Sequence, residues 1–575
     1  MHQEFFIEGA CKRCEVVDVS GFEDLRHLKL VIGELFSFAD PNCMHHIFPL
    51  FSANANSFSA IFFHSQHDGA LISLEDIKSG RGPIELRASR KTPIKSPPGS
   101  RPLPYVGNHY EVYPDPLGNY DRLFARYGPM IKTVNMGTTI YHTNDPVISR
   151  HVLREGDLFT KITSDPSHPL FYMNDQTALF TCDSSSPAFP ISHKFIPPAM
   201  SPRAIAHHAP LIQSATRSIF SVLDELSNGE LAFNVYQYMF KMAGQIIWRV
   251  VVGQDVEHFK ALNTPPTLAI RLFGEYLKLM KITSLRPKWY GSLPFGDPAR
   301  LRAVRAQLFD IVGKALDECV TPGGDLLSLQ DPAASLQASC IADFLCRARD
   351  NKGEGLPRDI LLGNVLVLLG AGFVTSASLL SWSIYSLVTY PGNQERLLQE
   401  LVDHGADGEK VWTHDELHSM KFLDCFVKET QRMHSPSFQT ARNAKKDVIL
   451  PGGYLIPAGS VVIPCFPSIH KNPAHWENPA RFDPNRWMDG DFAGTAMKRG
   501  LYTPFAAGGR GCVGFNLALM EVKMVLAELV YRYHFEDAST EAVVYDPEFL
   551  VVRPLNFYSS PVKRTEWPSI SMARE

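Results

Sequence analysis

The sequence predicts a mainly helical protein with small β-sheets, and three kinds of residue pattern indicate it. Apolar residues recur at three- and four-residue spacing from Phe515 to Tyr533, as they do on one face of an α-helix. A long apolar stretch, residues 361–388, suits a buried central helix. Alternating or β-rich runs, MIKTVNMGTTIYHT (130–143) and FLVVRPLNFY (549–558), indicate short strands.

Residues 1–91 are expected to form an N-terminal extension of unknown role, followed by a proline-rich hinge, TPIKSPPGSRPLPYVGN (92–108). The best apolar run in the extension, LVIGELFSF, is short and contains Glu34, so no transmembrane anchor or signal peptide is expected. With a single C-x-x-C pair, scattered thiols and histidines are favoured over a zinc site. The side chains that could supply zinc ligands are Cys11, Cys14, Cys43, His45 and His46.

The composition narrows the classes of function. The formal net charge of −4 and the 20% of charged residues are ordinary for a soluble chain and argue against nucleic-acid binding. The ten cysteines are irregularly spaced, which suggests free thiols in a reducing compartment. An intracellular protein is therefore expected.

A glycine-rich loop, TPFAAGGRGCVGF (503–515), precedes the C-terminal helical pattern. Gly509, Gly511 and Gly514 form G-x-G-x-x-G, a pattern that can hold a dinucleotide pyrophosphate at a helix N-terminus. Such a loop must follow a strand, but Pro504 cannot donate to a β-ladder. The 61 residues after Gly514 are also too few for a doubly wound sheet, so the dinucleotide interpretation is rejected.

The same loop can instead be built around its cysteine. Phe505, Gly508, Arg510, Cys512 and Gly514 read F-x-x-G-x-R-x-C-x-G. A cysteine at a loop-to-helix junction is stabilised as a thiolate by backbone N–H groups and the helix dipole, which suits a ligand of haem iron. Glycines let the backbone approach a flat macrocycle, and an arginine can pair with a propionate. The alternative is an ordinary buried cysteine in a glycine-rich loop.

At these residues the sequence resembles the cytochrome P-450 family, and the resemblance extends over residues 93–565. Glu429 and Arg432 match the family's E-x-x-R helix, on which they share one face. Arg486, in NPARFDPNRW, would complete a Glu–Arg–Arg cluster behind the haem. Arg442 falls where the family often places a propionate-binding arginine.

Two more segments carry the resemblance toward the N-terminus. Ala371, Gly372 and Thr375 match the family's distal helix, which implies Thr375 as the hydroxyl group that handles oxygen and protons. ISHKFIPPAMSPRA (191–204) resembles the family's third helix and the residues directly after that helix. There His193 would face a propionate, and Phe189 stands where a tryptophan is usual.

The resemblance implies a triangular, mainly helical haem domain over residues 109–565, followed by a C-terminal tail at 566–575. It implies haem b with Cys512 as the axial ligand. The implied reaction is that of a haem-thiolate monooxygenase, which inserts one oxygen atom from O2 into a hydrophobic small molecule. Electrons would come from a separate NADPH–cytochrome P-450 reductase, because no flavin domain follows the last β-rich run.

The substrate is expected to be a specialised metabolite or a lipid, as in fungal members, with segments that resemble the fatty-acid hydroxylase branch. The residues expected to contact it are Phe171 to Phe180, Leu368, Phe373, Ser437, Phe438, Leu550 and Val551. Two other functions stay open on the same scaffold. One is a hydroperoxide isomerase or dehydratase that needs no reductase, and the other is a non-catalytic haem protein.

The resemblance also implies surfaces outside the haem site. A basic patch for an acidic reductase is expected at Lys194, Lys498, Arg499 and Lys523. The location is either cytoplasmic or a loose, peripheral contact with the endoplasmic reticulum.

One position departs from the family. An acidic residue usually precedes the distal threonine, but this chain has Val374 there. Valine carries no proton, so proton delivery is expected to use Thr375, Ser376 and water, or a group on the substrate.

Overall fold

The computed structural model describes residues 94–113, 115–320, 323–437, 440–489 and 491–571, together with four strands nearer the N-terminus. Within these residues the α-helices are α4 (His109–Val112), α5 (Pro116–Tyr127), α6 (Pro146–Leu153), α7 (Ala188–Ala199), α8 (Pro202–Arg217), α9 (Phe220–Asn228), α10 (Val235–Val252), α11 (Leu268–Ser284), α12 (Gly296–Cys319), α13 (Ile341–Arg347), α14 (Arg358–Thr389), α15 (Asn393–Asp403), α16 (His414–Ser419), α17 (Lys421–Met433), α18 (Phe466–His470), α19 (Phe492–Lys498) and α20 (Phe515–Arg532).

The described strands and 3₁₀-helices are all short, with at most six residues each. The strands are β1 (His2–Ile7), β2 (Cys14–Asp18), β3 (Ile61–Ser65), β4 (Ile84–Ala88), β5 (Met130–Asn135), β6 (Thr138–Thr143), β7 (Phe159–Thr160), β8 (Phe233–Asn234), β9 (Leu327–Ser328), β10 (Ala348–Arg349), β11 (Arg442–Ala444), β12 (Val448–Leu450), β13 (Tyr454–Ile456), β14 (Val461–Pro464), β15 (Tyr533–Asp537), β16 (Val544–Tyr545), β17 (Pro554–Leu555) and β18 (Tyr558–Lys563). The 3₁₀-helices are η1 (Phe171–Met173), η2 (Lys288–Ser292), η3 (Ala334–Gln337), η4 (Pro484–Trp487) and η5 (Gly508–Arg510).

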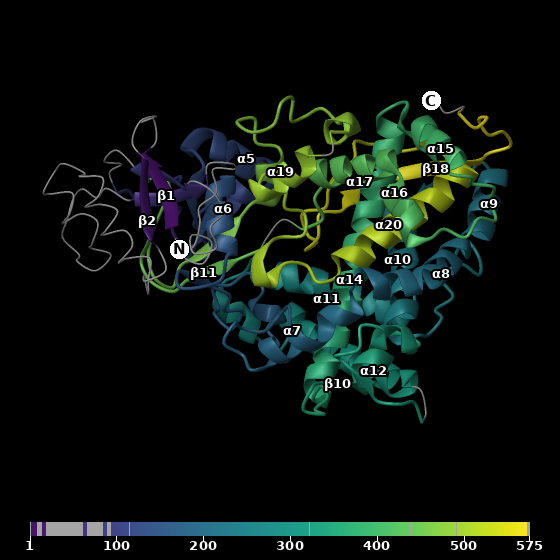
Figure 1. Ribbon diagram of the computed structural model, residues 1–575, viewed down its shortest axis with the longest axis horizontal. Coiled ribbons are helices and arrows are strands. Elements are labelled where there is room, and N and C mark those ends of the chain that lie inside the picture. The colour runs from purple at the N-terminus through teal and green to yellow at the C-terminus, as the bar shows by residue number, and fades with distance from the viewer. Residues whose placement is uncertain are drawn as a thin grey trace, which may run out of the picture.

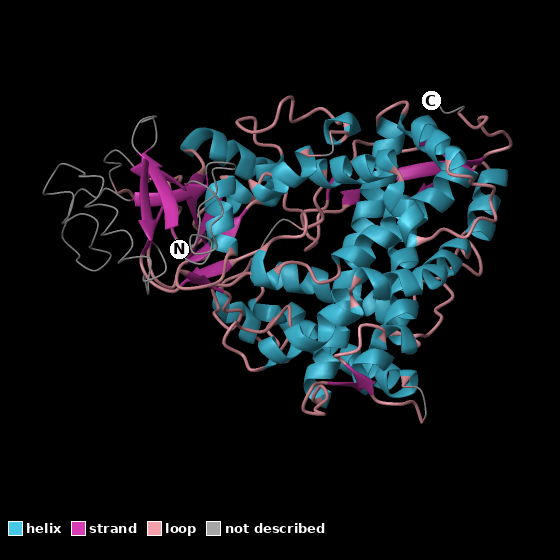
Figure 2. Cartoon of the chain, viewed as in Figure 1, coloured by secondary structure: helices cyan, strands magenta, loops and turns pink. Residues whose placement is uncertain are grey.

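The helices form a triangular body, broad between α5 and α15 and narrow at α12 (Figure 1). Strands are confined mostly to the side that carries β1 and to the region of β18, as Figure 2 shows. The predicted fold class, mainly helical with small sheets, is confirmed.

The long helix α14 runs through the middle of the body and packs chiefly against α10, with α12 and α20 as further neighbours (Figure 1). Its glycines allow the close approach, because a Cβ at Gly372 would lie 2.6 Å from the Ile247 side chain. Within the described part of the chain, α14 is the one helix long and apolar enough to cross a membrane, but 56% of its most apolar window is buried. It is the central core helix that the apolar stretch predicts.

The main sheet has the order β5-β6-β14-β11-β7. The run 130–143 forms its β5–β6 hairpin, and the two turn residues Met136 and Gly137 both have positive φ angles, 46° and 84°. A second sheet, β15-β18-β8, closes the other end of the body. The expectation for residues 549–558 is only partly met, since β17 takes just Pro554–Leu555 and β18 begins at Tyr558.

The proline-rich segment before α4 is bonded to the body along its length. The Lys95 N–H donates to Gly453 O at 2.9 Å, and the Lys132 N–H donates to Pro98 O at 2.8 Å. Asn108 caps the arrangement, because its Oδ1 accepts from the Val134 N–H at 2.8 Å. Nearer the N-terminus, the described strands form a four-stranded sheet, β2-β1-β4-β3.

Candidate functional site

The cysteine loop is held in a fixed shape by its own backbone and by α6. The Cys512 N–H donates to Phe505 O at 2.9 Å, and the Gly511 N–H donates to Gly508 O at 2.9 Å. Gly508 has a φ of +75°, and a Cβ there would lie 2.8 Å from the carbonyl oxygen of Leu153. Only glycine fits this contact without moving the backbone.

The Cys512 side chain is exposed at the end of this loop, immediately before α20. It nevertheless lies deep enough among protein atoms that desolvation raises the pKa of its thiol, which a hydrogen bond from the Gly514 backbone opposes. The start of α20 adds a positive dipole end that favours a thiolate. An accessible sulfur in this setting is suited to bind a metal, which would remove its proton.

One face of α14 is accessible to solvent, although most of this helix is buried in the core. Val367 and Thr375 are partly exposed and Ala371 is exposed, at a spacing of four residues, so they share one helix face. This face therefore borders solvent-accessible space inside the body. Thr375 lies on it, and its hydroxyl donates to Ala371 O at 2.9 Å.

Three basic side chains are gathered around one carboxylate near the cysteine loop. Arg442 is 0% exposed and Lys161 4% exposed, and the side chain of Arg510 is 3% exposed. Glu155 lies 3.3 Å from Arg442 and 3.6 Å from Arg510. The Arg510 guanidinium also stacks on the ring of Phe189, 3.7 Å from its centroid.

These cations are not fully satisfied by protein groups. Desolvation and the neighbouring arginines lower the pKa of Lys161, whose ammonium donates to Phe180 O. Burial likewise lowers the pKa of Arg442 to about 10. Within the described residues, Nη2 of Arg442 has no hydrogen-bond partner, and the Nε atoms of Arg442 and Arg510 meet Glu155 as ion pairs without hydrogen-bond geometry. Buried excess positive charge of this kind suits an anionic ligand, and the two propionates of haem would complete it.

His193 lies on α7 and is exposed, with its ring 5.7 Å from that of Phe189. It therefore stands next to the Arg510–Phe189 stack, where a propionate could be reached. Lys161 and Glu155 were not singled out from the sequence. Their role depends on burial beside Arg442 and Arg510, which no local pattern encodes.

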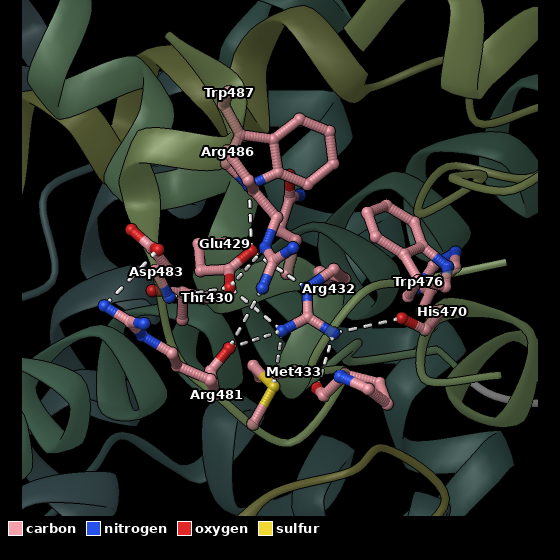
Figure 3. Close-up of polar contacts among 12 residues, drawn as sticks. Glu429, Thr430, Arg432, Met433, His470, Trp476, Arg481, Asp483, Arg486 and Trp487 are labelled. Carbon is pink, nitrogen blue, oxygen red and sulfur yellow. Dashed lines mark hydrogen bonds and ion pairs between the residues drawn. The ribbon is translucent and has the colours of Figure 1, made fainter. Parts of the chain in front are cut away.

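Glu429 is the centre of a buried polar cluster (Figure 3). Its carboxylate accepts two bonds from Arg432 at 2.9 Å each and one from Arg486 at 3.0 Å. Trp487 Nε1–H donates to it at 2.8 Å, and so does the Asp483 backbone N–H. Glu429 and Arg432 are both 0% exposed, so this is a core network and not a surface pair.

The remaining guanidinium protons of Arg432 bind backbone carbonyl groups from the following loops. They reach His470 O at 3.1 Å, Pro479 O at 2.8 Å and Arg481 O at 3.1 Å. The cluster therefore ties α17 to the chain between α18 and η4. It supports the fold and offers no open face for a ligand.

A buried carboxyl group lies beside α14 where the family's usual acid is missing. Glu521, on α20, is 1% exposed, and desolvation raises its pKa to about 8. The hydroxyl of Ser376 lies close enough to lower this pKa somewhat, although both groups lack a hydrogen-bond partner of good geometry. Val374 points elsewhere, since it is 3% exposed and belongs to the apolar core. Sequence reasoning missed Glu521.

The residues expected to contact the substrate differ in their exposure. Phe180 is 44% exposed, and Leu368 is partly exposed on α14. Phe373 is 0% exposed and packs its ring 4.8 Å from that of Phe240, so its assignment as a substrate contact was wrong. Phe438 lies outside the described residues.

The expected basic patch also needs a correction. The Lys523 side chain is 2% exposed and bonded to Asp424 at 2.8 Å, so it cannot meet a partner. Lys194 is bound to Asp350 at 2.6 Å. Lys498 and Arg499 are exposed.

The zinc ligands considered near the N-terminus, Cys11, Cys14, Cys43, His45 and His46, fall outside the residues whose side chains are described. Across the part of the chain that is described, no group of three or more His, Cys, Asp or Glu residues is arranged to hold a metal ion.

A helical body that leaves one cysteine open at a glycine-rich turn, beside buried unsatisfied cations, is the arrangement of a haem-thiolate protein. The chain belongs to the cytochrome P450 family, whose model, described as "Cytochrome P450", matches residues 97–559. It is a cytochrome P450 monooxygenase and hence an oxidoreductase, and members of this family bind haem through a cysteine thiolate.

Individual relatives agree with this assignment. The chain is 49% identical over 520 residues to cytochrome P450 monooxygenase alnD of Emericella nidulans, covering 90% of this chain and 93% of that one. It is 27% identical over 475 residues to an abscisic acid 8'-hydroxylase of Solanum lycopersicum, covering 80% and 90%. The crystal structure of the cytochrome P450DA heme domain superposes with a TM-score of 0.72 at 20% identity, covering 82% of this chain and 98% of that one.

Proposed function

We propose that the protein inserts one oxygen atom from O2 into a hydrophobic specialised metabolite or lipid, with electrons from a separate NADPH–cytochrome P-450 reductase. The observation that carries this proposal is the exposed Cys512 thiol at the loop-to-helix junction, beside the buried cations Lys161, Arg442 and Arg510. Haem bound there would supply oxygen activation, which a thiolate ligand promotes by donating electron density.

Each part of the site has a distinct task in this proposal. Cys512 would hold the haem iron through its thiolate, and Phe505, Gly508 and Gly514 shape the loop that carries it. Arg510 and Arg442 would hold the propionates, with His193 close to Arg510 across Phe189. Thr375 offers its hydroxyl on the open face of α14, where it can exchange its bond to Ala371 O for one to water.

Proton supply is proposed to come from α20 instead of the residue before Thr375. Because its pKa is raised to about 8, Glu521 holds a proton at neutral pH, which the Ser376 hydroxyl would accept while it gives its own proton to a neighbouring water molecule. Ser376 follows Thr375 on α14, but consecutive helical side chains do not face each other, so water is proposed to bridge from Ser376 to the open face that carries Thr375. This would replace the acid that Val374 cannot provide.

A peripheral contact with the endoplasmic reticulum is part of the proposal. Tyr105 is 96% exposed, Tyr110 73% and Trp289 66%. His109, next to Tyr110, and Lys288, next to Trp289, line the same cavity, so two of these aromatic residues come from segments that border it. Amphipathic aromatic rings in such a position suit the interfacial layer of a membrane.

The axial-ligand assignment is tested with Cys512→Ser in the haem-loaded protein. The reduced carbonyl complex of the wild type should show the strongly red-shifted Soret band of thiolate ligation, and Cys512→Ser should lose it. Cys319→Ser, at a partly exposed cysteine on α12, should keep it. A red-shifted band in well-folded Cys512→Ser protein would remove Cys512 from its role.

The reaction class is tested on the same preparations. Product formation should require both NADPH and the reductase. Turnover of a fatty-acid hydroperoxide without a reductase would instead identify the isomerase or dehydratase class.

A further inference from the structure

A cavity of about 70 Å³ lies between α4, the β5–β6 hairpin and the end of α11 with η2. By the usual measure this holds roughly five water-sized spheres. That is room for a carboxyl or similar polar group, but not for the body of a hydrophobic substrate. Phe171 and Tyr172 form one wall, and they belong to the segment where the family resemblance places substrate contacts.

The lining of this cavity is asymmetric in charge. Lys281, Arg286 and Lys288 contribute basic side chains, and none of the described residues that line it is Asp or Glu. His142 and His168 also line it, but desolvation lowers the pKa of each to about 3, so they are uncharged at neutral pH. Counted over the described lining residues, the net charge is therefore positive.

Lys281 is the innermost of the three basic groups, with 2% of its surface exposed. Burial lowers its pKa to about 8, and Asp546 opposes this shift from outside the lining. Asp546 is already bonded to Arg553, whose Nε donates to it at 2.8 Å. The ammonium of Lys281 also lies 5.9 Å from the centre of the Tyr113 ring.

The uncharged polar groups of the cavity include hydrogen-bond donors. Burial raises the pKa of Tyr113 to about 12 and holds that of Tyr120 well above its ordinary value, so both hydroxyl groups stay protonated; Tyr120 donates to Tyr113, which leaves the Tyr113 proton for a ligand. Ser167 adds a further hydroxyl donor to the wall, whereas the Asn108 amide already donates to Ser100 and Glu111. Cations and hydroxyl donors around a space of this size match the needs of a carboxylate.

We propose that this cavity binds the carboxylate of the substrate, so that the protein acts on apolar molecules that carry an acidic group. The inference rests on the proposed monooxygenase function and adds the substrate class to it. Lys281 is the specificity-determining residue, while Arg286 and Lys288 attract the anion at the opening. The apolar body of the substrate extends past Phe171 and Tyr172.

The test measures binding of dodecanoate and of methyl dodecanoate to the full-length holoenzyme by calorimetry. The wild type should bind the acid at least about tenfold more tightly than the ester. Lys281→Met should abolish this preference, and Lys281→Arg should keep most of it. Lys278→Met is the matched control, because Lys278 lies on the same helix but is half exposed and paired with Glu548 at 3.1 Å.

Equal binding of acid and ester by the wild type would overturn the proposal, as would an acid preference that survives in Lys281→Met. Tighter binding of dodecyl phosphate than of dodecanoate would assign the cavity to a lipid phosphate and also overturn it. If Lys281→Met does not fold, Arg286→Gln/Lys288→Gln must weaken dodecanoate binding by about tenfold. The spectrum of the reduced carbonyl complex of the same wild-type sample tests the proposed monooxygenase function separately. If that spectrum shows the thiolate band but the protein does not prefer the acid, only the carboxylate site is contradicted.

Discussion

Glu521 is a buried carboxyl group beside α14, and we propose that it takes over the role of the acid that Val374 replaces. The acid expected before Thr375 is absent, and a different carboxyl group approaches α14 from α20 in its place. Its raised pKa of about 8 results from desolvation with little compensation from hydrogen bonds. A neutral, protonated carboxyl group in this position costs stability at high pH.

The first residue-scale prediction concerns Glu521→Gln and pH. The folded protein keeps the Glu521 proton up to about pH 8, whereas the unfolded chain releases it near pH 4.5. The free energy of unfolding of the wild type therefore falls through this window, by at most about 1.4 kcal/mol per pH unit from this group. Glutamine does not titrate, so the stability of Glu521→Gln relative to wild type should rise between about pH 5 and pH 8.

Urea denaturation of both proteins at several pH values measures this difference. The same variant should form less product per NADPH consumed if Glu521 supplies protons. A stability difference that does not change with pH would show that Glu521 is ionised in the folded state.

The second residue-scale prediction concerns Val374→Glu. From the sequence, an acid at this position would restore the family's usual pair. The structure predicts a different result, because Val374 is 3% exposed within the apolar core. A carboxyl group buried there without partners should destabilise the fold by several kcal/mol, while Val374→Ile should cost about 1 kcal/mol. Thermal melts decide between these outcomes, and a stable, better-coupled Val374→Glu enzyme would contradict the placement.

At the scale of elements, the loop before α20 depends on one glycine far more than on its neighbour. Gly508 combines a φ of +75° with a Cβ position 2.8 Å from Leu153 O, whereas a Cβ on Gly509 would meet nothing within 4 Å. Gly508→Ala should therefore displace the Cys512 loop and lower the haem content of the purified protein several-fold. Gly509→Ala should leave the haem content nearly unchanged. Comparable haem contents in the two variants would show that the loop tolerates the strain.

Elements with strong local patterns were predictable from the sequence. The apolar spacing from Phe515 to Tyr533 corresponds to α20, Phe515–Arg532, and the apolar stretch 361–388 lies within α14, Arg358–Thr389. The run 549–558 was less predictable, because its apolar residues Phe549 and Val551 are buried by packing against other elements and not by a ladder. The spacing of apolar residues indicates the local backbone conformation. It does not indicate which other element packs against those residues.

Some site residues could likewise be predicted from local sequence patterns, and others could not. Cys512 could be singled out because glycines, an arginine and a helix start surround it in sequence. Lys161, Glu155 and Glu521 could not, since each acquires its character from residues distant in sequence. Lys523 was placed on the surface from its charge alone, but α20 buries it against Asp424 of α17.

At the scale of the whole molecule, the exposed pair Lys498 and Arg499 marks the expected face for the reductase. Reversing both charges in Lys498→Glu/Arg499→Glu should slow reduction of the haem about tenfold at low salt and flatten its salt dependence. Lys314→Glu is the control, because Lys314 is exposed on α12, at the opposite end of the body (Figure 1). Stopped-flow reduction with equal rates in all three proteins would place the reductase elsewhere.

The hydrogen bonds of segment 94–108 determine how far the protein can be shortened from its N-terminus without loss of stability. This segment was expected to act as a hinge, yet both backbone groups of Lys95 bond to the chain at β13. Its N–H donates to Gly453 O at 2.9 Å, and its carbonyl oxygen accepts from the Leu455 N–H at 2.9 Å. A shortened protein starting at residue 109 would lose these bonds and leave β13 and β5 with unpaired edges. A shortened protein that starts at residue 94 keeps these bonds. We therefore expect a stable catalytic body only from proteins whose first residue precedes Lys95.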